Sequence, residues 1–558
     1  MKYIKLFKTK AQYEAFKASA DYLKPNVSFI ETYNEAHIEK FVDDRIILTF
    51  NITDTSAPTR LYYDSSNAGI DYGNAFTSIE VDGVELPTVV GEYTFTTTGE
   101  HIVKYAPNYD YELEIDGQNY GWDAYAIALF YDITEITSAI IPDGCPSSPG
   151  FNGCVNLETL VLPDSITEIL VGTFQLCSSL KSVKLPKKLQ TLSGFDSCSS
   201  LTSITIPPMV TTIGEDAFNG CSGLVSIHIP SNVTEIGLGG FNSCSGLTSL
   251  TIPSNVTTIG PNAFSYCSNI SSLTIENGVE SIGTRAFLNN DGLTEVTIPE
   301  SITSIGLSAF ENCDDLETVI YKASNCAITV TGTFGQAFNT YVFNNTPVKT
   351  IGIGKEVENI PRRLFEANTS IENVLFEKGR TKSFSLANYA FKDCTSLLNF
   401  DFDLVSSIGD YAFSGCESLS TITYNGDAYD EGKFDTPIYI HSEITNVGNY
   451  AFKDCEHIDL VRIDVDYTGD IGEYAFYGCT GMKYVVIETD CSIGSYAFAG
   501  CTDLIGIAIS TETPPELGVG AFDNTNGCPI IVPDGFEETY KTEWPDYASR
   551  IISEMHGG

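Results

Sequence analysis

One short pattern, G-x-x-A-F-x-x-C, recurs so often along this chain that it dictates how the chain can fold. The early copies are marked by Phe151, Phe174, Phe195, Phe218, Phe241, Phe264, Phe287 and Phe310. A looser series continues at Phe338, Phe365, Phe391, Phe413, Phe452, Phe476, Phe498 and Phe522. Five consecutive spacings, from Phe195 to Phe310, are 23 residues each. A fixed period of this size predicts a solenoid of stacked repeats instead of one globular core.

The copy at residues 210–230 shows what one repeat should fold into. Leu224, Ile227 and Ile229 follow L-x-x-I-x-I, and the last two alternate about His228, which is the period of a strand with one buried face. The preceding G-x-x-A-F-x-x-C segment is expected to form one or two helical turns, with its Ala, Phe and Cys side chains inward. A single repeat cannot bury its apolar side, whereas stacked repeats can.

The patterns L-x-x-I-x-I-P and I-G-x-x-A-F-x-x-C, at about 23 residues per turn, resemble the BspA-like class of leucine-rich repeats over roughly residues 150–533. The resemblance implies a mainly β repeat fold: a right-handed solenoid with a parallel sheet along one face and short helices. It also implies a non-enzymatic surface or adhesion protein, as members of that class mostly are. Insertions at 321–347 and 425–446 make the second half less regular than the first.

Outside the repeats the chain changes character. We expect a short α/β element at 1–40, a small antiparallel β domain at 41–135, the solenoid at 136–534 and a cap at 535–558. Within the β domain, Asp82-Gly83 and Thr98-Gly99 are typical of hairpin turns.

The segment after the last repeat carries four large apolar side chains: Tyr540, Trp544, Tyr547 and Ile551. These side chains are expected to cover the open apolar end of the solenoid, because a stack of repeats must be closed at its ends. A binding role for Trp544 is the alternative.

The first residues reverse the charge of the chain. Residues 1–24 hold six lysines against Glu14 and Asp21, whereas the whole chain has a formal charge of −43. Docking on an acidic partner is one interpretation, and an ordinary solvated face is the other. The candidate anchoring residues are Lys2, Lys5, Lys8, Tyr13 and Phe16. The opening MKYIKLF…AQYEAFK…PNVSFIE resembles the N-termini of structural proteins of crAss-like and related phages of gut bacteria.

The sixteen cysteines mostly follow the repeat. Twelve stand three residues after the phenylalanine, at positions 154, 177, 198, 221, 244, 267, 313, 394, 416, 455, 479 and 501. Asn290 and Asn368 occupy the same place in two other repeats, which predicts a column of small buried thiols in preference to a disulfide framework. The sequence leaves open the state of Cys145, Cys326, Cys491 and Cys528.

Charge and motifs argue against several classes of function. A formal charge of −43 disfavours nucleic acid and anionic lipid as partners. Apolar runs are too short for a membrane span, and the first residues lack the apolar block of a secretory signal. No pattern for a metal, a cofactor or a catalytic site stands out, so we expect no cofactor and no enzymatic activity. A glycan-acting enzyme would need a carboxylate pair that the sequence does not single out.

What remains for binding is the outward side of the solenoid sheet. In the first half its positions are small and hydroxylated, as at Ser249, Thr251, Ser272 and Thr274, with His228 as an exception. The second half offers Leu460 with Arg462 and then Tyr484 with Val486. Tyr and Arg are favoured at interfaces, so these four residues and His228 are the candidate contacts for a partner.

Together these patterns favour a non-enzymatic virion protein of a phage. Its N-terminal region would bind other virion proteins, and its solenoid would project as a head or tail fibre, or as a decoration, that contacts a host surface protein or glycan. A homo-oligomer is compatible with this picture. The alternative is an adhesin on a bacterial cell surface.

Overall fold

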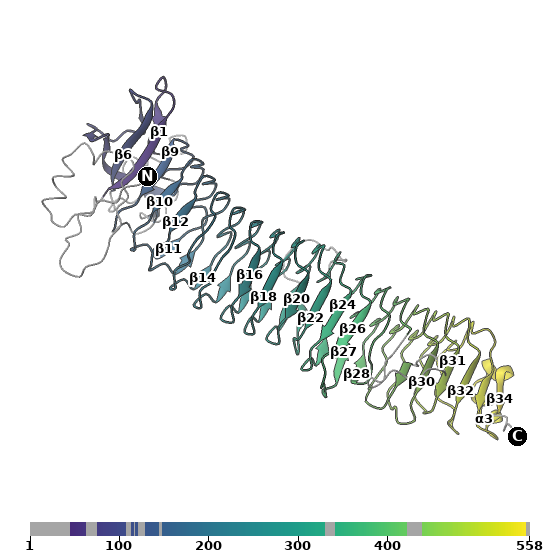
Figure 1. Cartoon of the computed structure of the whole chain (residues 1–558). Helices are drawn as coiled ribbons and strands as arrows, with labels where there is room; N and C mark the ends of the chain where they lie inside the picture. Colours follow the sequence, from purple (N-terminus) through teal and green to yellow (C-terminus); the bar gives the residue numbers. More distant parts are fainter. Residues whose placement is uncertain are drawn as a thin grey trace. The chain divides into compact units, whose positions relative to one another are not determined.

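The computed structural model of the chain describes residues 45–62, 75–107, 113–115, 118–120, 129–143, 145, 148–329, 341–420 and 438–553 (Figure 1). The chain divides into two compact units, which are described separately. The first comprises Met1–Val233 with Ser243–Gly246, and the second comprises Thr234–Asn242 with Leu247–Gly558. The anchoring residues proposed at Lys2, Lys5, Lys8, Tyr13 and Phe16 lie outside the described residues.

The first unit is built from short strands. They are β1 (Ile46–Ile52), β2 (Thr59–Arg60), β3 (Phe76–Val81), β4 (Val84–Glu85), β5 (Glu92–Tyr93), β6 (Gly99–Pro107), β7 (Leu113–Ile115), β8 (Gln118–Tyr120), β9 (Ile136–Ile140), β10 (Thr159–Val161), β11 (Glu168–Ile169), β12 (Ser182–Lys184), β13 (Thr191–Leu192) and β14 (Thr212–Ile213).

A single sheet of the first unit changes from antiparallel to parallel, in the order β12-β10-β9-β1-β6-β3-β4. Strand β1 pairs antiparallel with both β6 and β9, and β9 then pairs parallel with β10. The small antiparallel sheet predicted from the sequence is therefore present, and its hydrogen bonding continues into the first coils of the solenoid (Figure 1).

The two hairpins expected in this sheet have different outcomes. Asp82 and Gly83 have φ of 49° and 85° and join β3 to β4, as predicted. The turn at Thr98-Gly99 was wrong: Gly99 begins β6, whose partners are β1 and β3, while β5 pairs with β2. The local turn signal there was overridden by pairing with strands far away in the sequence.

The second unit consists of coils that carry a strand on one or both of two sides. Its strands are β15 (Glu235–Ile236), β16 (Ser249–Ile252), β17 (Thr258–Ile259), β18 (Ser272–Ile275), β19 (Ser281–Ile282), β20 (Glu295–Ile298), β21 (Ser304–Gly306), β22 (Thr318–Tyr321), β23 (Ala327–Thr329), β24 (Thr350–Ile353), β25 (Asn359–Ile360), β26 (Asn373–Phe376), β27 (Phe384–Leu386), β28 (Val405–Ile408), β29 (Ile438–Ile440), β30 (Leu460–Ile463), β31 (Tyr484–Ile487), β32 (Gly506–Ile509), β33 (Ile530–Val532) and β34 (Ile551–Ser553).

Neighbouring coils pair in parallel and in register. Strand β16 pairs with β18. Strands β20, β22, β24 and β26 form a four-stranded sheet, and β29 to β34 form a six-stranded sheet, as Figure 1 shows along the second unit. The predicted repeat fold with a parallel sheet is thus confirmed. The phenylalanine ring of each coil stacks on the phenylalanine ring of the next coil. From Phe241 to Phe522 the ring centroids of successive coils are 5.0–5.7 Å apart.

The phenylalanine column corrects the sequence-based register at one insertion. Phe343, not Phe338, stacks between Phe310 and Phe365, at 5.3 and 5.6 Å. Phe338, the phenylalanine predicted for this place, follows an alanine as the motif requires, and it lies outside the described residues. Phe343 follows Val342 instead, and both side chains are buried. In the first unit the column also begins earlier than predicted, because Phe130 stacks on Phe151 at 5.0 Å.

The G-x-x-A-F-x-x-C segments form successive turns and not the helical turns expected. Residues two before and two after the phenylalanine take left-handed φ, as at Asn262 (52°) and Tyr266 (60°). These residues redirect alternate amides toward the next coil, so the Phe264 N–H donates to the Ala286 carbonyl at 2.8 Å. An α-helix would bond the same amides within the segment. Here the neighbouring coil satisfies them.

Each cysteine of the column donates its S–H to the phenylalanine carbonyl of the preceding coil. All twelve sulfur–oxygen distances lie between 3.0 and 3.3 Å. Asn290 and Asn368 replace cysteine because their amides donate the same bond, to Phe264 at 3.0 Å and to Phe343 at 3.3 Å. All sixteen cysteines, including the four outside the column, are buried free thiols.

We expect Asn290→Cys to raise the free energy of unfolding by about 1–2 kcal/mol. Asn290 is fully buried, and its carbonyl oxygen accepts no hydrogen bond within the described part of the chain. Cysteine would keep the bond to the Phe264 carbonyl and remove this unpaired acceptor. Urea unfolding of the two proteins measures the difference.

Asn368→Cys is the matched control and should destabilise by about 1 kcal/mol or more. Here the amide also donates to Thr346, and its oxygen accepts from the Ser370 N–H at 3.2 Å. Cysteine would lose these bonds. Equal changes in both variants would show that the unpaired oxygen does not matter.

The C-terminal segment packs on the last coil. Helix α3 (Glu537–Glu543) and the 3-10 helix η4 (Pro545–Arg550) lead into β34. Tyr540, Trp544, Tyr547 and Ile551 are all buried. The Tyr547 and Trp544 rings lie 5.8 and 6.2 Å from that of Phe522. These contacts close the apolar end of the phenylalanine column.

Candidate functional site

The structure brings together four of the five residues predicted to contact a partner. Strands β30 and β31 pair so that Leu460 lies opposite Tyr484 and Arg462 lies opposite Val486. Arg462 is exposed, Tyr484 is 37% exposed, and the other two side chains are half-buried. His228 belongs to the first unit, where its side chain is exposed on a segment without an assigned strand.

Arg462 is held in place by its neighbours. Its Nε and Nη2 atoms donate to the two carboxylate oxygens of Glu488 at 2.9 and 3.0 Å. Its guanidinium carbon lies 5.9 Å from the ring centroid of Tyr439, whose hydroxyl donates to Asp464 at 2.5 Å. A bidentate pair of this kind fixes the orientation of the side chain and neutralises its charge. The charge of Arg462 is therefore compensated next to the paired side chains of Leu460, Tyr484 and Val486.

The outward face of the sheet differs between early and late coils of the second unit. On β16 and β18 the exposed residues are Ser249, Thr251, Ser272 and Thr274, which pair across the strands as predicted. The late sheet carries no such ladder; Ile552 on β34, for example, is 45% exposed. The change from hydroxyl to apolar side chains marks the late face as the more suitable surface for a partner.

A second feature of the late coils was not found from the sequence: a column of stacked tyrosines. The tyrosine ladder consists of Tyr389, Tyr411, Tyr450, Tyr474 and Tyr496, each two residues before a column phenylalanine. Successive ring centroids lie 5.0, 4.6, 4.8 and 5.0 Å apart, with interplanar angles of 5°, 5°, 2° and 22°. The rings thus form one regular row across five coils.

Both ends of the tyrosine ladder are covered. The Arg363 guanidinium lies 5.0 Å from the centroid of the Tyr389 ring. At the other end, a Cβ added to Gly520 would lie 2.5 Å from Cε1 of Tyr496, so glycine is required for this close approach. Because the faces are occupied, the rings offer their edges and hydroxyls to solvent. Burial, followed by the neighbouring tyrosines, raises the pKa of Tyr411, so its hydroxyl remains a hydrogen-bond donor.

Side-chain hydrogen bonds also join the residues that directly precede the first three tyrosines of the ladder, which are Asn388, Asp410 and Asn449. Asp410 accepts hydrogen bonds from the Asn388 amide at 3.1 Å and from the Asn449 N–H at 2.9 Å. Asn449 in turn accepts from the Glu473 N–H at 2.8 Å. The ladder is therefore presented on a backbone whose geometry is fixed by each neighbouring coil, which lowers the entropy lost on binding.

The signal for the ladder was present in the sequence as Y-A-F in five successive copies. Earlier copies carry other residues at that place, such as Asp216 and Asn262. The G-x-x-A-F-x-x-C pattern leaves this place unspecified, because the residue there varies among the earlier copies. Within the described ranges, no group of three or more His, Cys, Asp or Glu side chains is arranged to hold a metal ion. None of the helices in those ranges has the length and hydrophobicity to cross a bilayer.

Coils of this length, with a recurring inward phenylalanine and parallel strands, define a leucine-rich-repeat solenoid, a class of fold suited to binding. The family described as "BspA type Leucine rich repeat region (6 copies)" matches residues 126–194, 193–317, 325–435 and 427–542. These matches cover more than half of the chain, which therefore belongs to the BspA-type leucine-rich repeat family.

Several solved structures are similar to this chain. A leucine-rich repeat protein from Bacteroides ovatus has 20% identity and a TM-score of 0.44, with 75% of this chain and 95% of the other covered. A leucine rich cell surface protein from Faecalibacterium prausnitzii has 24% identity and a TM-score of 0.28, with 71% and 86% covered. The pneumococcal vaccine antigen PcpA has 17% identity and a TM-score of 0.31, with 67% and 94% covered. The comparison with curated proteins found no match.

Proposed function

We propose that this chain is a non-enzymatic adhesion protein, and that the late coils of its second unit bind a protein or glycan on a host cell surface. The observation that carries the proposal is the tyrosine ladder, a rigid row of five phenol hydroxyls. The apolar face around Leu460, Tyr484 and Val486 adds a further surface of interface type.

Stability alone does not account for tyrosine at these positions. The five residues have φ of 55–65°, which costs a residue with a bulky side chain about 1–2 kcal/mol. Stacking of aromatic pairs returns about 0.5–1.5 kcal/mol for each pair. The cost at five residues exceeds what four stacked pairs return, and asparagine would occupy the same conformation at lower cost. Five successive tyrosines are therefore better explained by recognition, since Tyr is enriched where binding energy is concentrated.

We further propose that the chain is part of a phage virion, with residues 1–40 as its attachment to other virion proteins. Two observations support this: the likeness of the opening sequence to phage structural proteins, and the buried free thiols, which suit a protein that folds in a reducing cytoplasm. Attachment to a bacterial cell surface is the alternative localisation. A homo-oligomer is compatible with either.

Mass spectrometry of purified virions and of host envelope fractions would separate the two localisations. We expect the chain among the virion proteins. A chain that lacks residues 1–40 should fold and yet fail to join particles. Enrichment in the envelope fraction, or normal assembly of the shortened chain, would contradict the virion role.

Binding of the purified, fluorescently labelled chain to cells of the bacterium that supports those virions tests the ladder. The double variant Tyr450→Asn, Tyr474→Asn should reduce cell binding at least tenfold, because it removes two central rings while asparagine suits the left-handed φ. Tyr131→Asn, at a tyrosine that is 42% exposed in the first unit, is the control and should bind normally. Undiminished binding by the double variant would locate the contact elsewhere.

A further inference from the structure

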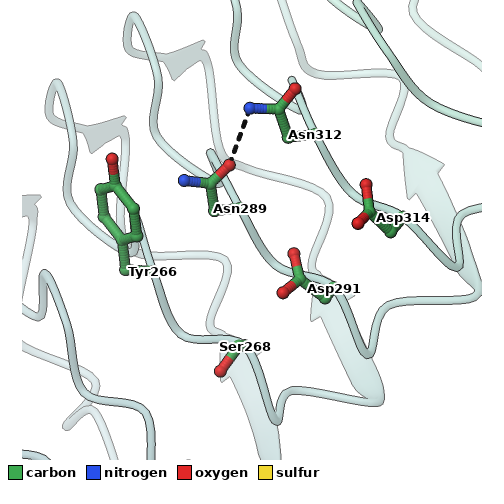
Figure 2. A pocket seen from close by; sticks show the side chains of 6 residues that line it. All are labelled: Tyr266, Ser268, Asn289, Asp291, Asn312 and Asp314. Carbon is green, nitrogen blue, oxygen red and sulfur yellow. Dashed lines mark hydrogen bonds between the residues drawn. The ribbon is translucent and has the colours of Figure 1, made fainter.

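A polar groove crosses three coils of the second unit, outside both surfaces described above. It encloses about 510 Å³ and is lined by Tyr266, Ser268, Asn289, Asp291, Asn312 and Asp314 (Figure 2). We call it the Tyr266 groove. Its residues come from equivalent turns, two and four residues after Phe264, Phe287 and Phe310. Figure 2 shows the Tyr266 ring at one end of the row and the two carboxylates side by side on successive coils.

One hydrogen-bonded row of amides forms a wall of the groove. The Asn312 amide donates to Asn289 at 2.9 Å, and Asn345 donates to Asn312 at 3.1 Å. This chain of bonds orients each amide but leaves the Nδ2 group of Asn289 without an acceptor among the described residues. It also shows why asparagine recurs here, because the φ of Asn289, Asn312 and Asn345 is 52–57°.

The other groups in the groove are likewise available to a ligand. Among the residues that the structure describes, the hydroxyls of Tyr266 and Ser268 and the carboxylates of Asp291 and Asp314 make no side-chain hydrogen bond or ion pair. The Tyr266 side chain is 50% exposed and stacks on no other described ring. The groove thus offers two acceptors, one amide donor, two hydroxyls and one free aromatic face.

We propose that the Tyr266 groove binds an uncharged saccharide. A sugar ring has a hydrophobic C–H face, which suits the free Tyr266 ring, and hydroxyls that both donate and accept, which suit the carboxylates and the Asn289 amide. A second hollow of about 350 Å³ shares Asp314 and continues over the turns at Asn345 and Ala367. The two hollows together accommodate more than one sugar unit.

The charge of the groove selects against acidic sugars. Asp291 and Asp314 face it, Asp315 lies beside them, and the range 201–300 contains a single cation, Arg285. Burial, together with the charges of Asp314 and Asp315, raises the pKa of Asp291, in keeping with this crowding of negative charge. Uronic, sialylated or sulfated sugars would meet uncompensated repulsion.

A metal ion fits the groove less well than a sugar does. Calcium takes six to eight oxygen ligands, usually with several carboxylates, whereas the groove is lined by two, and the described residues form no group of three or more His, Cys, Asp or Glu side chains able to hold an ion. The aromatic ring would also have no part in a metal site. The inference does not depend on the phage role or on the tyrosine ladder.

Saturation-transfer NMR with the full chain tests the proposal, with trisaccharides of glucose, mannose, galactose and N-acetylglucosamine as probes and with the uronic acids of the hexoses as acidic counterparts. We expect at least one neutral probe to bind and the acidic probes not to bind. Tyr266→Asn should weaken binding about tenfold, which is what loss of the aromatic contact is worth. This variant reproduces the residue found at the same place in the next two coils, so its turn should fold.

Three further variants locate the binding. Tyr266→Phe keeps the ring and should retain most of the affinity, whereas Asp314→Asn should weaken it. Tyr484→Ala, on the sheet face of β31, should leave the groove unaffected, so a failure of the adhesion surface and a failure of the groove are told apart. The proposal is overturned if no neutral probe binds, if Tyr266→Asn binds normally, if acidic sugars bind better, or if Ca²⁺ alone binds and Asp314→Asn abolishes it.

Discussion

Raising the pH from 9 toward 12 should progressively lower the free energy of unfolding of the chain. Burial raises the pKa of the Cys154, Cys221, Cys313 and Cys501 thiols from 9.0 to about 12. Between these values the folded chain holds protons that the unfolded chain releases, so the free energy of unfolding falls as the pH rises. Each thiol contributes a slope of up to about 1.4 kcal/mol per pH unit. Below pH 9 this loss is absent.

Urea unfolding at a series of pH values, followed by circular dichroism, measures the slope. Cys221→Ser is the control, because serine can donate to the Phe195 carbonyl, as Cys221 does at 3.1 Å, but does not titrate in this range. The free energy of unfolding of this variant should fall less steeply with pH than that of the parent, and the difference should equal the contribution of one thiol. A stability that stays flat from pH 9 to 12 would mean that the column is open to solvent or already oxidised.

The second large effect is expected from Phe264→Ala, which should cost about 3–5 kcal/mol. Phe264 is fully buried and stacks on Phe241 and Phe287 at 5.2 and 5.6 Å. The loss should be local, because each coil contacts only its neighbours. Hydrogen exchange should therefore show reduced protection in the coils of these three residues, with distant coils unchanged.

Leu238→Ala is the control for Phe264→Ala. Leu238 lies close to Phe241 in the sequence but is 43% exposed, so its truncation should change stability by no more than about 0.5 kcal/mol. Equal effects of the two substitutions, or a uniform loss of protection along the second unit, would contradict a core column with nearest-neighbour contacts.

Much of the fold followed from the sequence because the repeat reports burial directly. Phe264, Cys267 and Ile252 occupy positions of the repeat that return at fixed intervals, and all three side chains are buried. The insertion before Phe343 was not resolved in this way, since either of two phenylalanines could enter the column and only stacking on Phe310 decides between them. The sequence predicted helical turns in place of the observed turns because the spacing of the repeat does not specify the backbone φ of individual residues. The left-handed φ of Asn262 and Tyr266 therefore could not be inferred from it.

The candidate sites were predictable only in part, for a related reason. Leu460 and Tyr484 could be paired from the sequence because the repeat fixes which strand positions lie opposite each other. The bond from Arg462 to Glu488 depends on side-chain conformation as well, and repeat spacing does not specify that. The Tyr266 groove is assembled from three coils whose residues at that place differ, so no single repeat contains its pattern.

The hydrogen bond from each column cysteine to the coil before it has a genetic consequence. Because a bond of the same kind joins most neighbouring coils, a coil can be added or removed between two of them without a new kind of buried contact. Removal of residues 265–287, one period of 23, would join Phe264 to Leu288 and keep the order of the motif. Unequal recombination between such similar stretches can therefore add or delete coils in frame. The number of coils in the solenoid can therefore change from one generation to the next by whole coils, while the kinds of buried contact stay the same.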